Sequence, residues 1–155
     1  MVDGDSATMA EVLALLSRLA KAPLRQDLAI TGSMSQQGFS QAIGGVNHKI
    51  EGFFRLCQER GLNGSQGVVI PHSNIKNLML HPDIVAAVKK KKFAIYPVEH
   101  VDQACELFTG LKAGQRGKQG RFPKGTLNYL VEQEVQRMLQ LAMAMDKKPK
   151  KKKKS

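Results

Sequence analysis

The chain has 155 residues, enough for one ordinary hydrophobic core, and its hydrophobic content of 42% is typical of a globular domain. The net charge is +11, of which residues 146–155 supply +6 through seven lysines and one aspartate, so the other residues carry +5. No apolar run is long enough to span a membrane and the start of the chain is polar. We therefore expect no transmembrane segment, no signal peptide and no membrane partner.

The first predicted element is a helix that begins near Ala7. Apolar residues recur at helical spacing after this point, and Pro23 lies just past the end of the pattern. Asp5 or Ser6 is the expected N-cap, so Ser6 would lie where backbone N–H groups favour developing negative charge. The oxyanion of an acyl-transfer reaction needs such a place. A lone serine before a helix is, however, most often only a cap.

A second candidate side chain follows two short predicted strands, at residues 27–31 and 38–43. After a Gly-Gly pair, an apolar stripe predicts an amphipathic helix over residues 46–60. Lys49 falls in its first turn, where the helix dipole and burial against apolar neighbours would favour the neutral amine that a general base requires. Thr31 closes the first strand, which is an ordinary place for a β-branched residue.

Taken together, these residues are the parts of a serine–lysine dyad. The hydroxyl of Ser6 precedes one helix, the amine of Lys49 starts another, and the Thr31-Gly32 step lies between them in the sequence. Such a dyad hydrolyses peptide bonds with lysine, rather than histidine, as the general base. His48 is left out of the mechanism because neighbouring residues on a helix point apart.

The rest of the first 109 residues alternates short apolar strands with helices. This order predicts an α/β (α+β) fold in which a mixed sheet packs against helices. The predicted elements are a buried strand at 67–70 that ends at Pro71, a loop with a short turn at 72–80, a helix at 83–91, a strand at 93–98, and a helix at 101–108 that starts near Glu99 or His100.

An ordered set of short motifs runs through the first two-thirds of the chain. Its segments are Asp3-Gly4-x-Ser6-Ala7, Thr31-Gly32-Ser33, Gly38, Ile43-Gly44-Gly45 with Lys49, Val69-Ile70-Pro71 with Asn74, and Ile95-x-Pro97-Val98. This set resembles the proteolytic domain of Lon proteases, from Asp3 to about Phe108. Asp5 stands where the commonest bacterial pattern has proline, and in this it is similar to the branch that includes the archaeal-type enzymes.

The resemblance implies a Lon-like fold and a serine endopeptidase of the ATP-dependent type. It makes Ser6 the nucleophile, Lys49 the base, Thr31 a hydroxyl near the lysine and Asp3 a positioning or regulatory carboxylate. It also implies polypeptide substrates, a ring-shaped homo-oligomer and an ATPase domain or subunit. ATP and Mg²⁺ would belong to that ATPase part, so no cofactor is expected in this chain, which has no GxxxxGK[ST] phosphate loop. The family strands that precede the nucleophile are expected to be lacking here.

Residues 1–109 would form this proteolytic domain, and a different composition follows. Residues 110–125 are rich in glycine and basic side chains, which predicts a flexible linker. Residues 126–145 predict an amphipathic helix, which packs on its own domain or a neighbouring subunit, or else docks another protein. The lysine-rich residues 146–155 predict a disordered tail with weak, non-specific and salt-dependent affinity for polyanions.

Two classes of function stay open. One is a Lon-type serine endopeptidase, and the alternative is a truncated, catalytically silent remnant that acts as an assembly or interaction module through the 126–145 helix and the tail. The two cysteines, Cys57 and Cys105, lie on apolar helical faces. They predict reduced core thiols and hence a cytoplasmic protein.

Overall fold

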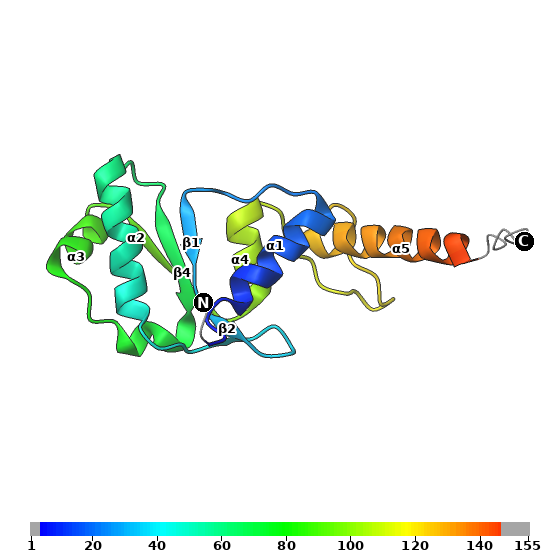
Figure 1. Cartoon of the computed structure of the whole chain (residues 1–155), viewed down its shortest axis with the longest axis horizontal. Coiled ribbons are helices and arrows are strands. Elements are labelled where there is room, and N and C mark those ends of the chain that lie inside the picture. Colours follow the sequence, from blue (N-terminus) through cyan, green and yellow to red (C-terminus); the bar gives the residue numbers. More distant parts are fainter. Residues whose placement is uncertain (1–3, 147–155) are drawn as a thin grey trace, which may run out of the picture.

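The computed structural model describes residues 4–146 and shows a parallel sheet with helices on both faces (Figure 1). The sheet has the strand order β1-β4-β5, so β4 is central. A separate antiparallel pair, β2 and β3, lies near the carboxyl end of this sheet. The strands are β1 (Leu28–Ile30), β2 (Ser33–Met34), β3 (Ser40–Gln41), β4 (Gly67–Pro71) and β5 (Ala94–Val98). The helices are α1 (Thr8–Ala20), α2 (Val46–Arg60), the 3₁₀ helix η1 (His72–Asn77), α3 (Pro82–Lys89), α4 (Val101–Thr109) and α5 (Leu127–Asp146). This confirms the predicted α/β class.

The alternation of side chains along β4 divides the core in two. Val69 packs with α1, α4 and the start of α5, whereas Val68 and Ile70 pack with α2 and α3. Successive side chains of a strand point to opposite faces, so a central strand with helices on both sides must be apolar throughout. All five residues of β4 are buried, as a continuous apolar run requires.

At the carboxyl end of the sheet, the backbone turns away from β1 after Thr31. Thr31 still donates its N–H to Val69 O at 3.1 Å, but the next N–H, of Gly32, goes to Ser6 O at 2.9 Å. The predicted strand at 27–31 is therefore shorter in the structure, because the backbone turns from the sheet toward the segment before α1. The predicted strand at 38–43 is also shorter, because the Asn74 side chain takes both backbone groups of Ile43.

Two helix starts show what the sequence pattern predicted and what it missed. His100 is the N-cap of α4, and its ring accepts from Asp102 N while Gln103 completes a capping box. The predicted cap of α1 is wrong: Ala7 is the N-cap, without a side-chain hydrogen bond. The main-chain oxygen of Asp5 instead accepts from Thr8, both from N–H at 3.0 Å and from the hydroxyl at 2.6 Å.

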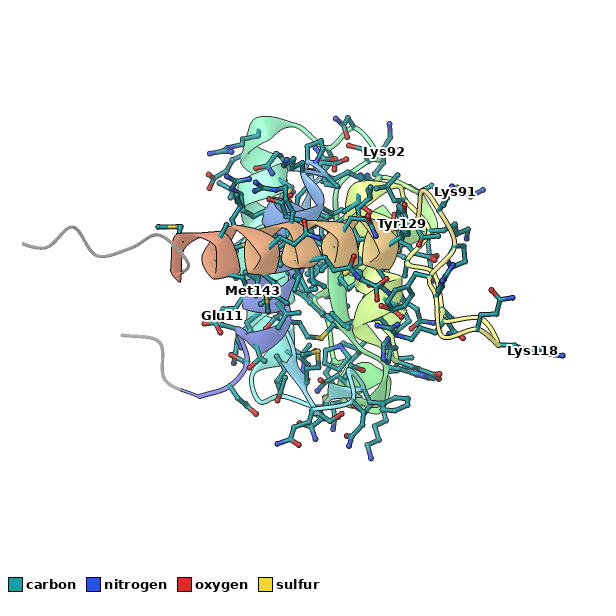
Figure 2. All side chains as sticks on the ribbon, turned by 90° about the vertical axis from the view of Figure 1, so that its right-hand side faces the viewer. Glu11, Lys91, Lys92, Lys118, Tyr129 and Met143 are labelled. Atoms are coloured by element: carbon teal, nitrogen blue, oxygen red, sulfur yellow. The ribbon has the colours of Figure 1, made fainter. Side chains whose placement is uncertain are left out.

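The segment between α4 and α5 makes several contacts with the body of the protein. Ala113 is buried, and the main-chain oxygens of Lys112 and Ala113 accept from Leu127 N and Asn128 N. Farther along, the loop that carries Lys118 extends away from the molecule (Figure 2).

Helix α5 has two unlike halves. Leu127 is fully buried and Leu130 and Val131 pack beside it on the α1–α4 core, while Glu134 pairs with Lys21 at the end of α1. Beyond this point α5 extends outward (Figure 1) and its apolar side chains are exposed. These are Val135, Met138, Leu139, Leu141, Met143 and Met145. None of the helices within residues 4–146 combines the length and apolar character of a membrane span.

Candidate active site

Ser6 and Lys49 meet at the carboxyl end of the sheet. The Lys49 amine lies 2.7 Å from Ser6 Oγ and 3.2 Å from Thr31 Oγ1, so a single nitrogen contacts both hydroxyls. Thr31 is buried, with 8% of its surface exposed. Its hydroxyl also donates to Ser6 O at 3.3 Å. The structure thus brings together three of the four predicted site residues, and Asp3 lies outside the described residues.

The loop that carries Ser6 is held by its backbone and by its neighbour in the sequence. The main-chain oxygen of Ser6 accepts from Gly32 N at 2.9 Å, and Met9 N returns a hydrogen bond to Gly32 O at 3.1 Å. The Asp5 carboxylate accepts from Ser33 Oγ at 2.5 Å. Residues 5–9 and 31–33 therefore run beside each other as a short pair of segments joined by hydrogen bonds.

Gly32 lets these two segments approach. A Cβ at this position would lie 2.6 Å from Met9 Sδ, closer than real Cβ atoms come, and 3.0 Å from Pro71 Cγ, a tight contact. Met9 is fully buried at the start of α1. Glycine is therefore required here for close packing, and this packing seats the start of α1 against the end of β1.

Lys49 is positioned by the start of α2. The N-cap of this helix is Gly45, whose φ of 67° lies in the left-handed region that glycine adopts without strain. Just before it, the buried Asn74 side chain accepts from Ile43 N and donates to Ile43 O, both at 3.0 Å. These two hydrogen bonds connect the segment before α2 to η1 and so fix where the first turn of α2 begins.

The expected burial of Lys49 against apolar neighbours is wrong for this structure. Lys49 is exposed and Ser6 is half-buried, so the dyad opens to solvent. The buried side chains of α2, which are Val46, Ile50, Phe54 and Cys57, all face the sheet. Lys49 lies off this stripe, at the rim of the helix, where no element within residues 4–146 covers it.

Other candidates do not join the site. His48 points into solvent, with 91% of its side chain exposed, and its nearest charged partner is Glu51 at 3.9 Å. Cys57 and Cys105 are buried free thiols. Burial raises the pKa of Cys105 to about 12, which keeps the thiol protonated and unreactive.

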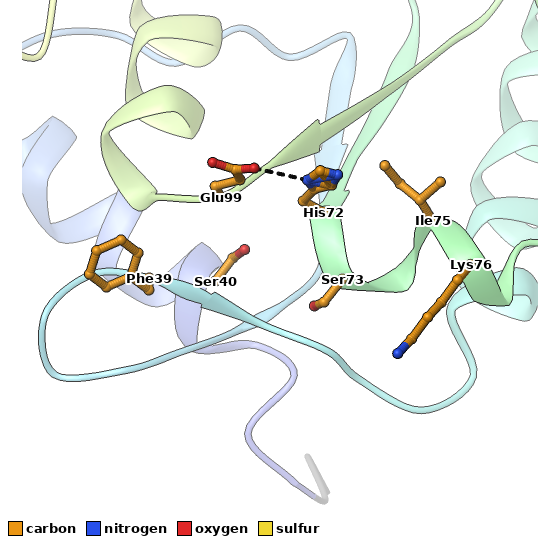
Figure 3. Close-up of a pocket in the computed structure, with 7 residues that line it drawn as sticks. All are labelled: Phe39, Ser40, His72, Ser73, Ile75, Lys76 and Glu99. Carbon is orange, nitrogen blue, oxygen red and sulfur yellow. Dashed lines mark hydrogen bonds and ion pairs between the residues drawn. The ribbon is translucent and has the colours of Figure 1, made fainter.

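A pocket of about 660 Å³ lies beside β3 and η1, apart from the dyad (Figure 3). In it the His72 ring and the Glu99 carboxylate are 3.1 Å apart, and the exposed Phe39 forms one side. None of its lining residues is Ser6, Lys49 or Thr31. This pocket is therefore not where the dyad chemistry would take place.

Three residues of the site had no role in the sequence-based interpretation. Gly32, Ser33 and Asn74 each stood in a motif, but their contacts link positions more than twenty residues apart. The sequence signals were a glycine directly after Thr31 and an asparagine three residues after Pro71. Neither position reveals which distant residue it contacts. Long-range packing alone assigns them.

Comparison with known proteins shows the family to which the sequence belongs. A family profile described as the Lon protease (S16) C-terminal proteolytic domain matches residues 2–109. A protein of Haemophilus influenzae, named as a Lon protease homolog, is 47% identical over 135 residues, which is 87% of this chain and 22% of that protein. A protein of Escherichia coli with the same description is 53% identical over 110 residues, 71% of this chain and 19% of that protein.

An archaeal relative is also similar to this chain over a small part of its own length. The archaeal Lon protease of Thermococcus kodakarensis is 41% identical over 106 residues, 68% of this chain and 15% of that protein. The chain thus spans about a fifth or less of the length of these relatives. Since the profile matches more than two-thirds of the sequence and includes Ser6, Thr31 and Lys49, the chain belongs to the Lon protease C-terminal proteolytic domain family.

Proposed function

We propose that this chain is the catalytic part of a serine endopeptidase of Lon type, with Ser6 as the nucleophile and Lys49 as the general base. The observation that carries the proposal is the distance of 2.7 Å between Lys49 Nζ and Ser6 Oγ. A nucleophile and base must lie within about 2.6–3.2 Å for proton transfer. A family whose members are named proteases supplies the reaction class.

The hydrogen bonds are compatible with a neutral lysine as base. In the structure the Lys49 amine donates to both hydroxyl oxygens. A neutral amine has one lone pair and two N–H groups, so it would keep the donation to Thr31 Oγ1 and accept the Ser6 proton. Thr31 can act as acceptor because its own hydrogen goes to Ser6 O. Thr31 would therefore orient the lone pair of Lys49 toward Ser6.

In the proposed reaction, Ser6 Oγ attacks the carbonyl carbon of a polypeptide while its proton moves to Lys49. The protonated Lys49 then gives this proton to the departing amine, which breaks the peptide bond and leaves an acyl ester on Ser6. Water, deprotonated by the neutral Lys49, hydrolyses the ester and restores the Ser6 hydroxyl. The start of α1 beside Ser6 favours the negative charge that develops in both steps.

Several properties of the parent architecture are part of the same proposal. We place Asp3 near the site as a positioning carboxylate, and we expect polypeptides to be supplied by an ATPase part that binds ATP and Mg²⁺. Two buried free thiols support a reducing, cytoplasmic location. We also propose the division made from the sequence, with residues 1–109 as the proteolytic domain, 110–125 as a linker, 126–145 as a helix and 146–155 as a tail.

An active-site probe tests the proposal directly. A fluorophosphonate should form an Oγ–phosphorus bond with Ser6 and release fluoride, and mass spectrometry of peptides would locate the adduct. Ser6→Ala should abolish both this adduct and the cleavage of an unfolded polypeptide. Ser40→Ala and Cys105→Ser are matched controls that remove another hydroxyl and a buried thiol. Equal labelling of Ser40 and Ser6, or cleavage that survives Ser6→Ala, would reject the assignment.

The exposed half of α5 favours a second function, self-assembly. Val135, Met138, Ala142 and Met145 follow one another at spacings of three, four and three residues, which is the pattern of a coiled-coil seam. The matched stretch of 135 residues shared with the Haemophilus influenzae relative must reach at least position 135, and so includes the start of α5.

We propose that this stripe pairs with the same stripe of a second copy. Two identical seams complement each other, and the charge of Arg137 in this half is already bound by Glu134 at 2.7 Å. Light scattering on the full chain should show a dimer or higher oligomer, and Met138→Lys with Met145→Lys should reduce it to monomer. Gln136→Lys with Gln140→Lys adds the same charge off the seam and should leave the oligomer intact. An unchanged mass for the seam variant would exclude α5 as the interface.

A further inference from the structure

The Asp5 carboxylate stands directly before the proposed nucleophile, yet it makes no ion pair with Lys49. Among the described residues, no carboxylate lies within 4.0 Å of the Lys49 amine. Asp5 therefore does not act as the counter-ion of the base in this structure. Its recorded partner is Ser33, whose hydroxyl donates to Asp5 Oδ2 at 2.5 Å.

Asp5 Oδ2 is the nearer of two oxygens that can accept from the buried Ser33 hydroxyl. Ser33 lies at the start of β2 with only 3% of its surface exposed, whereas Asp5 is at the surface. The hydroxyl has one hydrogen, and the oxygen of the Gln41 side chain lies farther away, at 3.3 Å. A charged acceptor at the shorter distance takes that hydrogen, and charge-assisted hydrogen bonds are roughly twice as strong as neutral ones.

The contact closes one end of a set of hydrogen bonds around Ser6. Thr31, Gly32 and Ser33 each contact the nucleophile loop, the first two at Ser6 O and the third at Asp5. The first two hold only the main chain. Asp5 O also accepts from Thr8 N and Thr8 Oγ1, but without the Ser33 contact the loop would lose its side-chain anchor at Asp5, and the Ser6 side chain could move away from Lys49.

We propose that Asp5 and Ser33 are positioning residues, and that their hydrogen bond holds the Ser6 hydroxyl at the distance from Lys49 that proton transfer needs. The inference rests on the proposed function, in which Ser6 is the nucleophile. A displacement of about 1 Å at a reacting group can cost about 100-fold in rate. Loss of this hydrogen bond should therefore slow the reaction of Ser6 with little effect on the fold.

A matched pair of substitutions isolates the hydroxyl. Ser33→Thr keeps a hydroxyl and Ser33→Val replaces it with a methyl group of similar size, so both add the same bulk to a buried position. The rate at which fluorophosphonate labels Ser6 should fall about 10- to 100-fold in Ser33→Val and in Asp5→Ala, and Ser33→Thr should restore much of it relative to Ser33→Val. Ser40→Ala removes a hydrogen bond to Val98 O elsewhere and serves as the control. Equal labelling rates for Ser33→Thr and Ser33→Val would overturn the proposal.

A second measurement does not depend on the reaction. Hydrogen exchange at Gly32 N–H and Thr8 N–H, which donate to Ser6 O and Asp5 O, should be faster in Ser33→Val than in Ser33→Thr. Exchange at Thr31 N–H, which donates to Val69 O in the sheet, should be the same in both. If wild-type Ser6 is not labelled, the proposed function fails, while faster exchange in Ser33→Val would still support a hold on the loop. Equal exchange in the two variants would show that the Asp5–Ser33 hydrogen bond does not restrain the loop, whatever the labelling shows.

Discussion

Lys49 Nζ and Ser6 Oγ lie 2.7 Å apart although 43 positions separate them in the sequence. Neither residue is fixed by its own helix alone. The Ser6 loop depends on the end of β1, through Gly32, and the first turn of α2 depends on Asn74 from η1. The dyad is therefore a product of how α1 and α2, on opposite faces of the sheet, are both anchored at its carboxyl end.

Lys49→Arg should be nearly as damaging as Lys49→Ala, with activity lower by about 1000-fold or more. The guanidinium keeps the charge but does not lose its proton in proteins, so it cannot serve as a base. The rate at which a fluorophosphonate labels Ser6 in the two variants measures this. His48→Ala should leave the labelling rate unchanged because the ring points into solvent. Loss of labelling in His48→Ala would instead identify a histidine mechanism.

Gly32→Ala should destabilise the protein by about 1–3 kcal/mol, the usual cost of overpacking a core position. The added Cβ would press on Met9 and Pro71, so the buried Met9 side chain, the start of α1 or the end of β4 must shift. Thermal unfolding measures the loss. Gly44→Ala, where a Cβ meets nothing within 4 Å, is the matched control and should change the midpoint little. Equal midpoints for the two variants would show that the approach of α1 is not this tight.

The start of the sheet should respond to acid through Asp27. The Arg25 guanidinium donates two hydrogen bonds to this carboxylate, at 3.0 and 2.7 Å, and holds its pKa at about 2, below the ordinary value of 3.8. A lowered pKa means that this contribution to stability is complete above about pH 4 and disappears as the pH falls toward about 2.

Asp27→Asn should therefore lower the unfolding temperature near neutral pH and flatten its fall between about pH 5 and about pH 2. Arg25 also donates to Ser65 O at 3.1 Å, so the effect reaches the start of β4. Because the pair is partly exposed, high salt should weaken the difference between wild type and variant. Parallel melting curves across this pH range would contradict the role of the pair.

Removal of residues 146–155 should change the stability of the domain by no more than about 0.5 kcal/mol, as for other surface changes. It takes away a net charge of +6 and no position of the apolar core. Binding to a DNA duplex should weaken, and the affinity of the intact chain should fall steeply with salt. Unfolding of the shortened chain, or salt-resistant binding to one DNA sequence, would show that the tail has a different role.

The sequence by itself determined most of the elements and the residues of the proposed dyad. Period-3.6 patterns predicted α1, α2 and α4, because one face of each helix packs on the sheet, and the apolar run at 67–70 predicted the buried strand β4. The order of Ser6, Thr31 and Lys49 among glycine-rich motifs indicated the family. These features are local or follow from residue order, so they do not depend on how distant segments pack.

Only the tertiary structure decided how those groups are held and how open they are. The sequence predicted a side-chain cap at Asp5 or Ser6, but the Asp5 carboxylate bonds Ser33, and its main-chain oxygen receives Thr8. It predicted burial for Lys49, but the apolar stripe of α2 turns toward the sheet and leaves Lys49 exposed at the rim. A hydrogen bond between residues 28 positions apart, and the cover over a helix end, depend on where distant segments pack. Periodicity along one segment carries no information about that packing.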